Sequence, residues 1–222
     1  MNHLQTRFAS IERCAKSYYI NPIILNAINL WRKSTYRLIT KAQLDPTAPD
    51  DEYKTAAAIL QALATDGRCG LGYRTTCFRG MVTNSDAWLN VGAVVRSTSL
   101  FAVTPSKIGA INYSRRIGDR RHEKYRVLFE FDIPARYPLA VIKLNIDSDM
   151  SEAVEWPMQA TEYEQVKHEP NWRYLDNCEF LIAADTAWIV RATRQVHDMF
   201  AADDGPLHIV NLSIITSPSR LY

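Results

Sequence analysis

The chain has 222 residues, of which 47% are hydrophobic and 23% charged, and its formal net charge is +2. These proportions are those of an ordinary globular protein, and the length suffices for one domain with a substantial core. No apolar run approaches the length of a membrane-spanning helix, and the first residues lack the apolar segment of a secretory signal peptide. We therefore expect a protein with no membrane partner.

The first helical signals surround the dipeptide Asn21-Pro22. Asparagine is a favoured N-cap, and proline suits the first position of a helix. Ile24, Ile28 and Trp31 then recur at the spacing i, i+4, i+7, which forms one apolar stripe. This pattern predicts a helix that packs against a core.

A second helix is predicted after the turn-rich segment DPTAPDDE, residues 45–52. Residues 55–64, TAAAILQALA, are strong helix formers, and Gly67 is suited to end the helix. Residues 1 to about 66 therefore read as helical. We expect residues 1–49 to form a helical extension packed on a larger domain at 50–222.

The pattern changes after Gly72, where short β-prone runs alternate with turn signals. Seven strands are predicted, at residues 73–80, 92–99, 125–134, 139–146, 178–184, 187–196 and 208–216. With little helix between them, they favour two packed, mainly antiparallel sheets over a βαβ array. The expected fold class is α+β, with helices first and a β-rich core after them. A Rossmann nucleotide site is not supported, since no Gly-x-Gly-x-x-Gly motif opens a helix after a strand.

Four cysteines are scattered along the chain, at Cys14, Cys69, Cys77 and Cys178. None forms a Cys-x-x-Cys pair, so the sequence predicts no metal site. We expect reduced thiols, as in a protein that folds in a reducing compartment.

Arg79 lies near the end of an otherwise apolar predicted strand and is followed by Gly80. Burying an arginine is costly unless it is paired, and its planar fork suits a pyrophosphate. Glycine at the next position would let a ligand approach the backbone closely. The alternative is an arginine that emerges into solvent at a strand end.

Three hydroxyl residues, Ser97, Thr98 and Ser99, follow an apolar start in the next predicted strand. Strand alternation would place Ser97 and Ser99 on one face and Thr98 on the other. Their hydroxyls either position another group or satisfy the backbone of a turn.

Glu179 lies beside an apolar run, where alternation places Asn177, Glu179 and Leu181 on one face. Such a carboxylate is either a charge at a strand edge or a group held for a purpose.

Taken in order, the segments FRG (78–80), VRSTSL (95–100) and NCEFLI (177–182) resemble the Arg–Ser–Glu class of mono-ADP-ribosyltransferases. That class contains many bacterial toxins and effectors. The resemblance covers roughly residues 50–215 and implies an ADP-ribosyltransferase-like fold with NAD as substrate. Because the gap from Arg79 to Ser97 is short, the helix between them is expected to be small or absent.

The resemblance also implies roles for four of these residues. Glu179 corresponds to the catalytic glutamate, which holds the ribose 2′-hydroxyl, and Ser97 to the serine that orients this glutamate. Arg79 would hold the NAD phosphates, and the backbone of Gly80 would bind the nicotinamide amide. No metal is implied.

Further NAD contacts are implied around this motif. Thr98 and Ser99 would shape the strand and its turn beside the nicotinamide. In the loop that follows, Tyr113 is the candidate for stacking on nicotinamide, and Arg115 and Arg116 are candidates for phosphate contacts. The alternative for that loop is a solvated basic segment.

Asn177 departs from the arginine-specific relatives, which carry glutamate two positions before the catalytic residue. An amide does not accept a proton near neutral pH, so Asn177 cannot serve as a base. It can hydrogen-bond an amide or a hydroxyl. We therefore expect a non-arginine acceptor, namely Asn, Gln, Thr or Ser, with arginine as the alternative.

The resemblance implies a secreted effector that acts in host cytoplasm on a target protein, such as a small GTPase, actin, ubiquitin or another regulator. Export would proceed without an ordinary signal peptide. Three alternatives stay open: an NAD glycohydrolase, a nucleic-acid acceptor, and an inactive interaction module. The nucleic-acid alternative rests on residues 107–126, which hold seven Lys/Arg against two acids.

Overall fold

The structure is a computed structural model. It describes residues 14, 17–18, 20–33, 36–45, 47, 50–67, 69–72, 74–114, 122–143, 178–196 and 205–215. Helices precede a β-rich core of two sheets, so the α+β fold expected from the sequence is confirmed.

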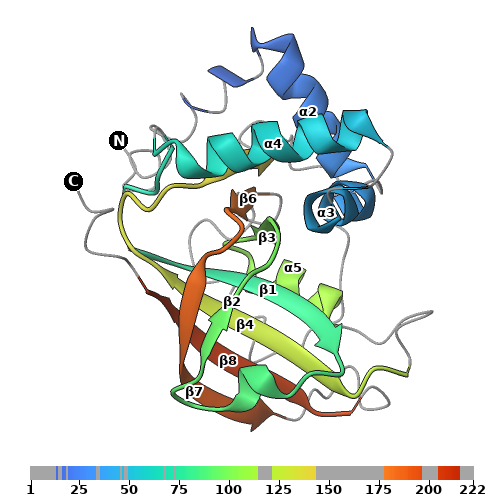
Figure 1. Cartoon of the computed structure of the whole chain (residues 1–222). Coiled ribbons are helices and arrows are strands. Elements are labelled where there is room, and N and C mark those ends of the chain that lie inside the picture. Colours follow the sequence, from blue (N-terminus) through green and yellow to red (C-terminus); the bar gives the residue numbers. More distant parts are fainter. Residues whose placement is uncertain are drawn as a thin grey trace, which may run out of the picture.

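Three helices form one layer over the smaller sheet (Figure 1). They are α2 (Pro22–Arg32), α3 (Tyr36–Leu44) and α4 (Asp51–Thr65). Contacts between elements join α2 and α4 to the small sheet. Because these helices and the strands share one apolar core, the boundary between 1–49 and 50–222 stays a prediction.

Helix α2 begins as predicted. The Asn21 side chain accepts hydrogen bonds from the backbone N–H groups of Ile23 and Ile24, which satisfies two of the free donors at the helix start. Ile28 and Trp31 are buried, so the apolar stripe faces the core.

Helix α4 also follows its sequence signals. Asp50 caps its first turn by accepting from the Glu52 N–H, and the helix ends just before Gly67, which has a φ of +73°. This left-handed conformation suits glycine at a helix end. Helix α3 was not separated from its neighbours by the sequence pattern.

The larger sheet has five strands in the order β1-β4-β8-β7-β2. The strands are β1 (Thr75–Thr83), β4 (Tyr125–Ile133), β8 (Leu207–Ile214), β7 (Ala187–Val196) and β2 (Val94–Arg96). Strands β4 and β8 are parallel and the other three pairs are antiparallel, so the sheet is mainly antiparallel as predicted.

The smaller sheet has the order β3-β6-β5. Its strands are β3 (Phe101–Val103), β6 (Glu179–Ile182) and β5 (Ala140–Lys143). An isolated bridge between Phe78 of β1 and Thr104 joins the two sheets along one seam. Aromatic rings fill the space between the sheets, with Phe131 centred 5.4 Å from Phe101 and 4.6 Å from Trp188.

The single strand predicted at 92–99 is wrong in extent. Strand β2 ends at Arg96, and after Ser97 the chain bends at Thr98–Ser99 before β3 begins in the other sheet. Because these hydroxyl residues are not in a strand, the alternating faces assigned to them do not apply. The bend is the point where the chain passes from one sheet to the other.

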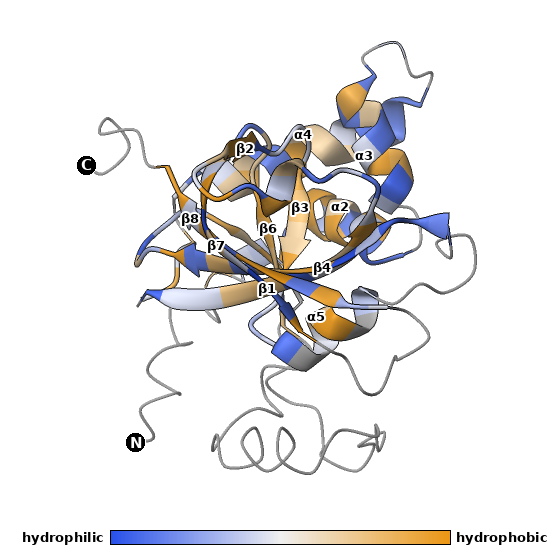
Figure 2. Ribbon diagram, turned by 90° about the horizontal axis from the view of Figure 1, so that it is seen from below, coloured by the Kyte–Doolittle hydropathy of each residue, from blue (hydrophilic) through white to orange (hydrophobic). Residues whose placement is uncertain are grey.

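Helix α5 (Lys107–Tyr113) occupies part of the segment that the sequence led us to treat as a loop. It lies on the face of the large sheet opposite α2–α4 (Figure 2). Ala110 packs there against Leu128, Leu207 and Ile209. Between Arg79 and Ser97 the chain forms only the short helix η1 (Ala87–Leu89), as the short gap predicted.

The expectation that all cysteines are reduced is wrong. Cys14 and Cys69 form a disulfide with a Cα–Cα distance of 6.0 Å, whereas Cys77 and Cys178 are free and buried. Sequence spacing gave no signal for this pairing, because the two residues are 55 positions apart.

Two kinds of feature are absent from the described residues. Among them, no helix is both long and apolar enough to cross a membrane. The same residues contain no cluster of three or more His, Cys, Asp or Glu side chains arranged to hold a metal ion.

Candidate active site

Arg79 bridges the seam between the two sheets. It lies in β1 opposite Phe129 of β4, and its guanidinium donates a 2.8 Å hydrogen bond to the Ala102 carbonyl of β3. The guanidinium carbon also lies 5.8 Å from the centre of the Phe101 ring, within cation–π range. Arg79 is therefore a partly buried, partnered group, rather than a strand-end charge emerging into solvent.

Glu179 lies close to the same seam. In the small sheet Val103 pairs with Phe180, and the next residue of β3's chain, Thr104, bridges to Phe78 of β1. Continuing this register by one residue sets Glu179 beside Thr104. The segment with Thr104 lies between β6 and β1, so the backbone of Glu179 is two strand spacings, or about 10 Å, from the backbone of β1. The topology thus brings Arg79 and Glu179, 100 positions apart, to one end of the seam.

The Glu179 carboxylate faces the helical layer. Its Oε1 accepts a 3.0 Å hydrogen bond from the indole Nε1 of Trp31 in α2. Phe180 is fully buried on the other face of β6, beside Val103. Glu179 is therefore a half-buried carboxylate held by a specific donor, and the alternative of a simple edge charge does not describe it.

Ser97 lies at the other end of β6. Its Oγ donates to the carbonyls of Ala183 and Thr186, each at 3.4 Å, and its backbone exchanges hydrogen bonds with Asp185 and Thr186. Ala183 is four residues beyond Glu179, about 13 Å along an extended strand. The structure does not bring Ser97 and Glu179 together. The Ser97 hydroxyl instead binds the backbone of a turn.

No protein-family model and no curated protein matches the chain. Solved structures do match. The Vis toxin, an ADP-ribosyltransferase from Vibrio splendidus, is 12% identical over 98% of this chain and 87% of its own, with a TM-score of 0.54. Plx2a, an ADP-ribosyltransferase toxin from Paenibacillus larvae, is 9% identical over 95% of this chain and 97% of its own, with a TM-score of 0.52.

A third similar structure is BECa, an ADP-ribosylating toxin of a binary enterotoxin from C. perfringens, solved with NADH. It is 12% identical over 95% of this chain, with a TM-score of 0.56. This chain spans only 46% of BECa.

The chain has the fold of the ADP-ribosyltransferase toxins. In this ADP-ribosyltransferase fold, residues 78–80 lie on β1, Ser97–Ser99 connect β2 to β3, and Glu179–Ile182 form β6. The expected recognition and the expected architecture are confirmed at the level of the fold.

Gly80 is required by helix packing in this ADP-ribosyltransferase fold. A Cβ on Gly80 would lie 1.6 Å from the Ala110 carbonyl oxygen of α5. The close approach of a helix therefore accounts for the absence of a side chain at Gly80, while the ligand approach that the sequence suggested stays a prediction.

The backbone of Gly80 nevertheless faces the seam. The N–H and C=O of Phe78 pair with Thr104, at 2.6 and 2.9 Å, on the side of β1 away from β4. Because strand backbone groups alternate in direction, those of Gly80 point to the same side two residues on.

Two glutamines hold the connections between the sheets, β2 to β3 and β6 to β7, and neither was identified from the sequence. Gln43 of α3 accepts a 2.8 Å hydrogen bond from the Leu100 N–H, and Gln61 of α4 accepts a 2.9 Å bond from the Ala184 N–H. The two amides also bond each other at 3.3 Å. Polar side chains within otherwise apolar helix faces were the available signal for these residues.

The remaining predicted residues do not gather around Glu179 in the described part of the chain. Thr98 is exposed in the bend and Ser99 is half-buried there. Tyr113 is the last residue of α5 and is 69% exposed. The predictions for Arg115, Arg116 and Asn177 lie outside the described residues.

Two buried thiols flank the candidate residues. Cys77 precedes Arg79 by two positions, and Cys178 directly precedes Glu179. Burial, reinforced by the nearby Cys178, raises the pKa of Cys77 to about 12. A thiol with such a pKa is not a nucleophile near neutral pH.

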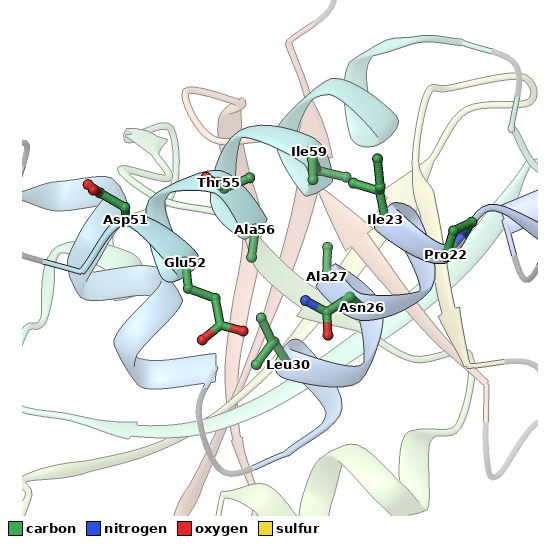
Figure 3. A pocket seen from close by; sticks show the side chains of 10 residues that line it. All are labelled: Pro22, Ile23, Asn26, Ala27, Leu30, Asp51, Glu52, Thr55, Ala56 and Ile59. Atoms are coloured by element: carbon green, nitrogen blue, oxygen red, sulfur yellow. The ribbon is translucent and has the colours of Figure 1, made fainter.

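A groove of about 500 Å³ lies elsewhere, between α2 and α4 (Figure 3). It is lined by Pro22, Ile23, Asn26, Ala27, Leu30, Asp51, Glu52, Thr55, Ala56 and Ile59. None of the predicted site residues lines it. We assign the candidate active site to the seam, because the charged groups suited to NAD chemistry lie there.

Proposed function

We propose that the protein is an NAD-dependent mono-ADP-ribosyltransferase that modifies a side chain of a target protein. Fold alone does not define activity, so the proposal depends on the site. The observation that supports it is that the backbones of Arg79 and Glu179 lie about two strand spacings apart at one end of the sheet seam, within an ADP-ribosyltransferase fold.

Transfer of ADP-ribose from NAD requires one anion-binding group and one carboxylate. The bond between nicotinamide and ribose breaks with its electron pair leaving on nicotinamide, through an oxocarbenium-like centre. Glu179 stabilises that positive charge and holds the ribose 2′-hydroxyl. Arg79 binds the diphosphate. The acceptor side chain then forms the new bond to the ribose carbon and loses its proton to solvent water.

The other predicted residues have supporting roles in the proposal. The seam-facing backbone of Gly80 binds the nicotinamide amide. Tyr113, Arg115 and Arg116 contribute NAD contacts from the segment after the sheet switch. Thr98 and Ser99 shape the bend.

For the acceptor we propose an Asn, Gln, Thr or Ser side chain, since an asparagine at position 177 cannot act as the base that an arginine acceptor favours. For the setting we propose a secreted bacterial effector that acts on a host protein such as a small GTPase, actin or ubiquitin. Support comes from the toxins with this fold and from the Cys14–Cys69 disulfide, which is typical of exported proteins.

The test is incubation of the purified protein with labelled NAD and a eukaryotic cell lysate, beside Glu179→Gln and the control Glu52→Gln on the exposed first turn of α4. A labelled protein band that needs Glu179 but not Glu52 supports transfer, and mass spectrometry of the modified side chain then tests the acceptor.

Three other results would each point to a named alternative. NAD consumption without a band would identify a glycohydrolase. Label that is lost on nuclease treatment would identify a nucleic-acid acceptor. If neither NAD binding nor NAD consumption is found, the chain is an interaction module.

A further inference from the structure

The carboxylate of Glu179 has one hydrogen-bond donor among the described residues, and that donor is Trp31. The indole Nε1 lies 3.0 Å from Oε1, and the Trp31 side chain is only 5% exposed. Ser97, the residue expected to orient Glu179, is engaged at the far end of β6. We propose that Trp31 is the positioning residue for Glu179, an inference that rests on the proposed function.

The surroundings of Trp31 hold its ring in place. Helix α2 is fixed at its start by the Asn21 cap and along its length by buried Ile28. Near the other end of the helix, the Trp31 ring lies 6.1 Å from the ring of Tyr36, the first residue of α3. Because packing already restricts the rotamers of Trp31, its indole loses little conformational entropy when it donates to the carboxylate.

A neutral donor suits this task. An indole N–H can donate but cannot accept, and it carries no charge. It fixes one carboxylate oxygen and leaves the negative charge available for the oxocarbenium-like centre, whereas a lysine or arginine in the same place would offset that charge. Among the described residues no donor bonds the second oxygen, which can therefore accept from the ribose 2′-hydroxyl.

This contact gives the N-terminal helices a part in catalysis. Trp31 lies within residues 1–49, yet it bonds a residue 148 positions later. The helical segment is then more than a cover for the small sheet, since it sets the direction of the central carboxylate.

The first test compares Trp31→Phe with Trp188→Phe. Both remove one indole N–H, but Nε1 of the fully buried Trp188 has no hydrogen-bond partner among the described residues. We expect Trp31→Phe to lower kcat for NAD cleavage about 10- to 100-fold, as for loss of a hydrogen bond to a charged group, with NAD affinity changed less than about 2-fold. Trp188→Phe should leave kcat within about 2-fold of the wild type.

A double variant asks whether Trp31 acts through Glu179. In a Glu179→Ala background, which removes the acceptor, adding Trp31→Phe should cause no further loss of kcat. An independent full loss, or a Trp31→Phe enzyme with unchanged kcat, would overturn the positioning role.

The contact itself can be tested without NAD, from the indole N–H signals in ¹⁵N NMR spectra. In Glu179→Ala, the Trp31 indole proton should move upfield and exchange faster, while that of Trp188 stays in place. An unmoved Trp31 signal would overturn the inference even if NAD chemistry is present. A moved signal in a protein whose wild type does not cleave NAD would overturn the proposed function instead.

Discussion

The close packing of α5 on β1 leaves no room for a side chain at Gly80. We expect Gly80→Ala to destabilise the protein by about 1–3 kcal/mol or more, because its Cβ would collide with the Ala110 carbonyl and force α5 off the sheet. The control is Gly72→Ala, since nothing lies within 4 Å of a Cβ there. Urea denaturation followed by circular dichroism measures both, and equal midpoints for the two variants would contradict the packing argument.

Cys77 predicts an alkaline limit to stability. Burial raises the pKa of this thiol from 9.0 to about 12, so the unfolded chain loses the proton at lower pH than the folded one. Stability is therefore fully present below about pH 9 and declines as the pH rises from 9 towards 12.

Denaturation midpoints at pH 8 and pH 10.5 should show this decline in the wild type and a smaller one in Cys77→Ala. The same slope in both proteins would assign the alkaline sensitivity to other groups.

At the scale of elements, the β2–β3 switch and the β6–β7 turn are held by the helices. Gln61→Ala should cost about 1–3 kcal/mol, because the Ala184 N–H and the Gln43 amide each lose a partner. Gln195→Ala, on an exposed position of β7, is the matched control and should change stability by less than about 0.5 kcal/mol. Thermal unfolding distinguishes them, and a Gln61→Ala protein as stable as the control would remove this anchor.

The sequence predicted those elements that are defined by local signals, such as helix caps and strand-forming residues. Strand β7 matches its predicted bounds of 187–196, and the Asn21 cap and the Gly67 stop were readable from single residues. The passage from β2 to β3 at Ser97–Ser99 was not readable from the sequence, because a run of hydroxyl residues is compatible with a strand and with a bend. Helix α5 was missed for a different reason: it has only seven residues, and it is stabilised by packing on the sheet.

Some residues of the candidate site could be predicted from the sequence and others could not. Arg79 and Glu179 were proposed from the sequence because the ordered segments around Arg79, Ser97 and Glu179 resemble the Arg–Ser–Glu class. Trp31 could not, since its apolar spacing predicts only burial, and its indole meets Glu179 through tertiary packing.

At the scale of the molecule, the Cys14–Cys69 disulfide links the N-terminal helical segment to the chain just before β1. Reduction should lower the free energy of unfolding by about 2–4 kcal/mol, as for a cross-link that closes a long loop. Thermal unfolding with and without a reductant measures this loss. The double variant Cys14→Ser/Cys69→Ser should be indifferent to reductant, and a wild type equally indifferent would show that the link adds no stability.

The strand order of the large sheet bears on how the chain is made. Strand β8, which follows the other four strands of this sheet in the sequence, lies in the middle of the sheet, with β4 on one side and β7 on the other. A nascent chain that has not yet released residues 207–214 from the ribosome therefore holds two separate half-sheets, each with an unpaired inner edge. Residues 207–214 must therefore leave the ribosome before the large sheet can close, and a chain that stops before this strand keeps two unpaired strand edges that can pair with other chains.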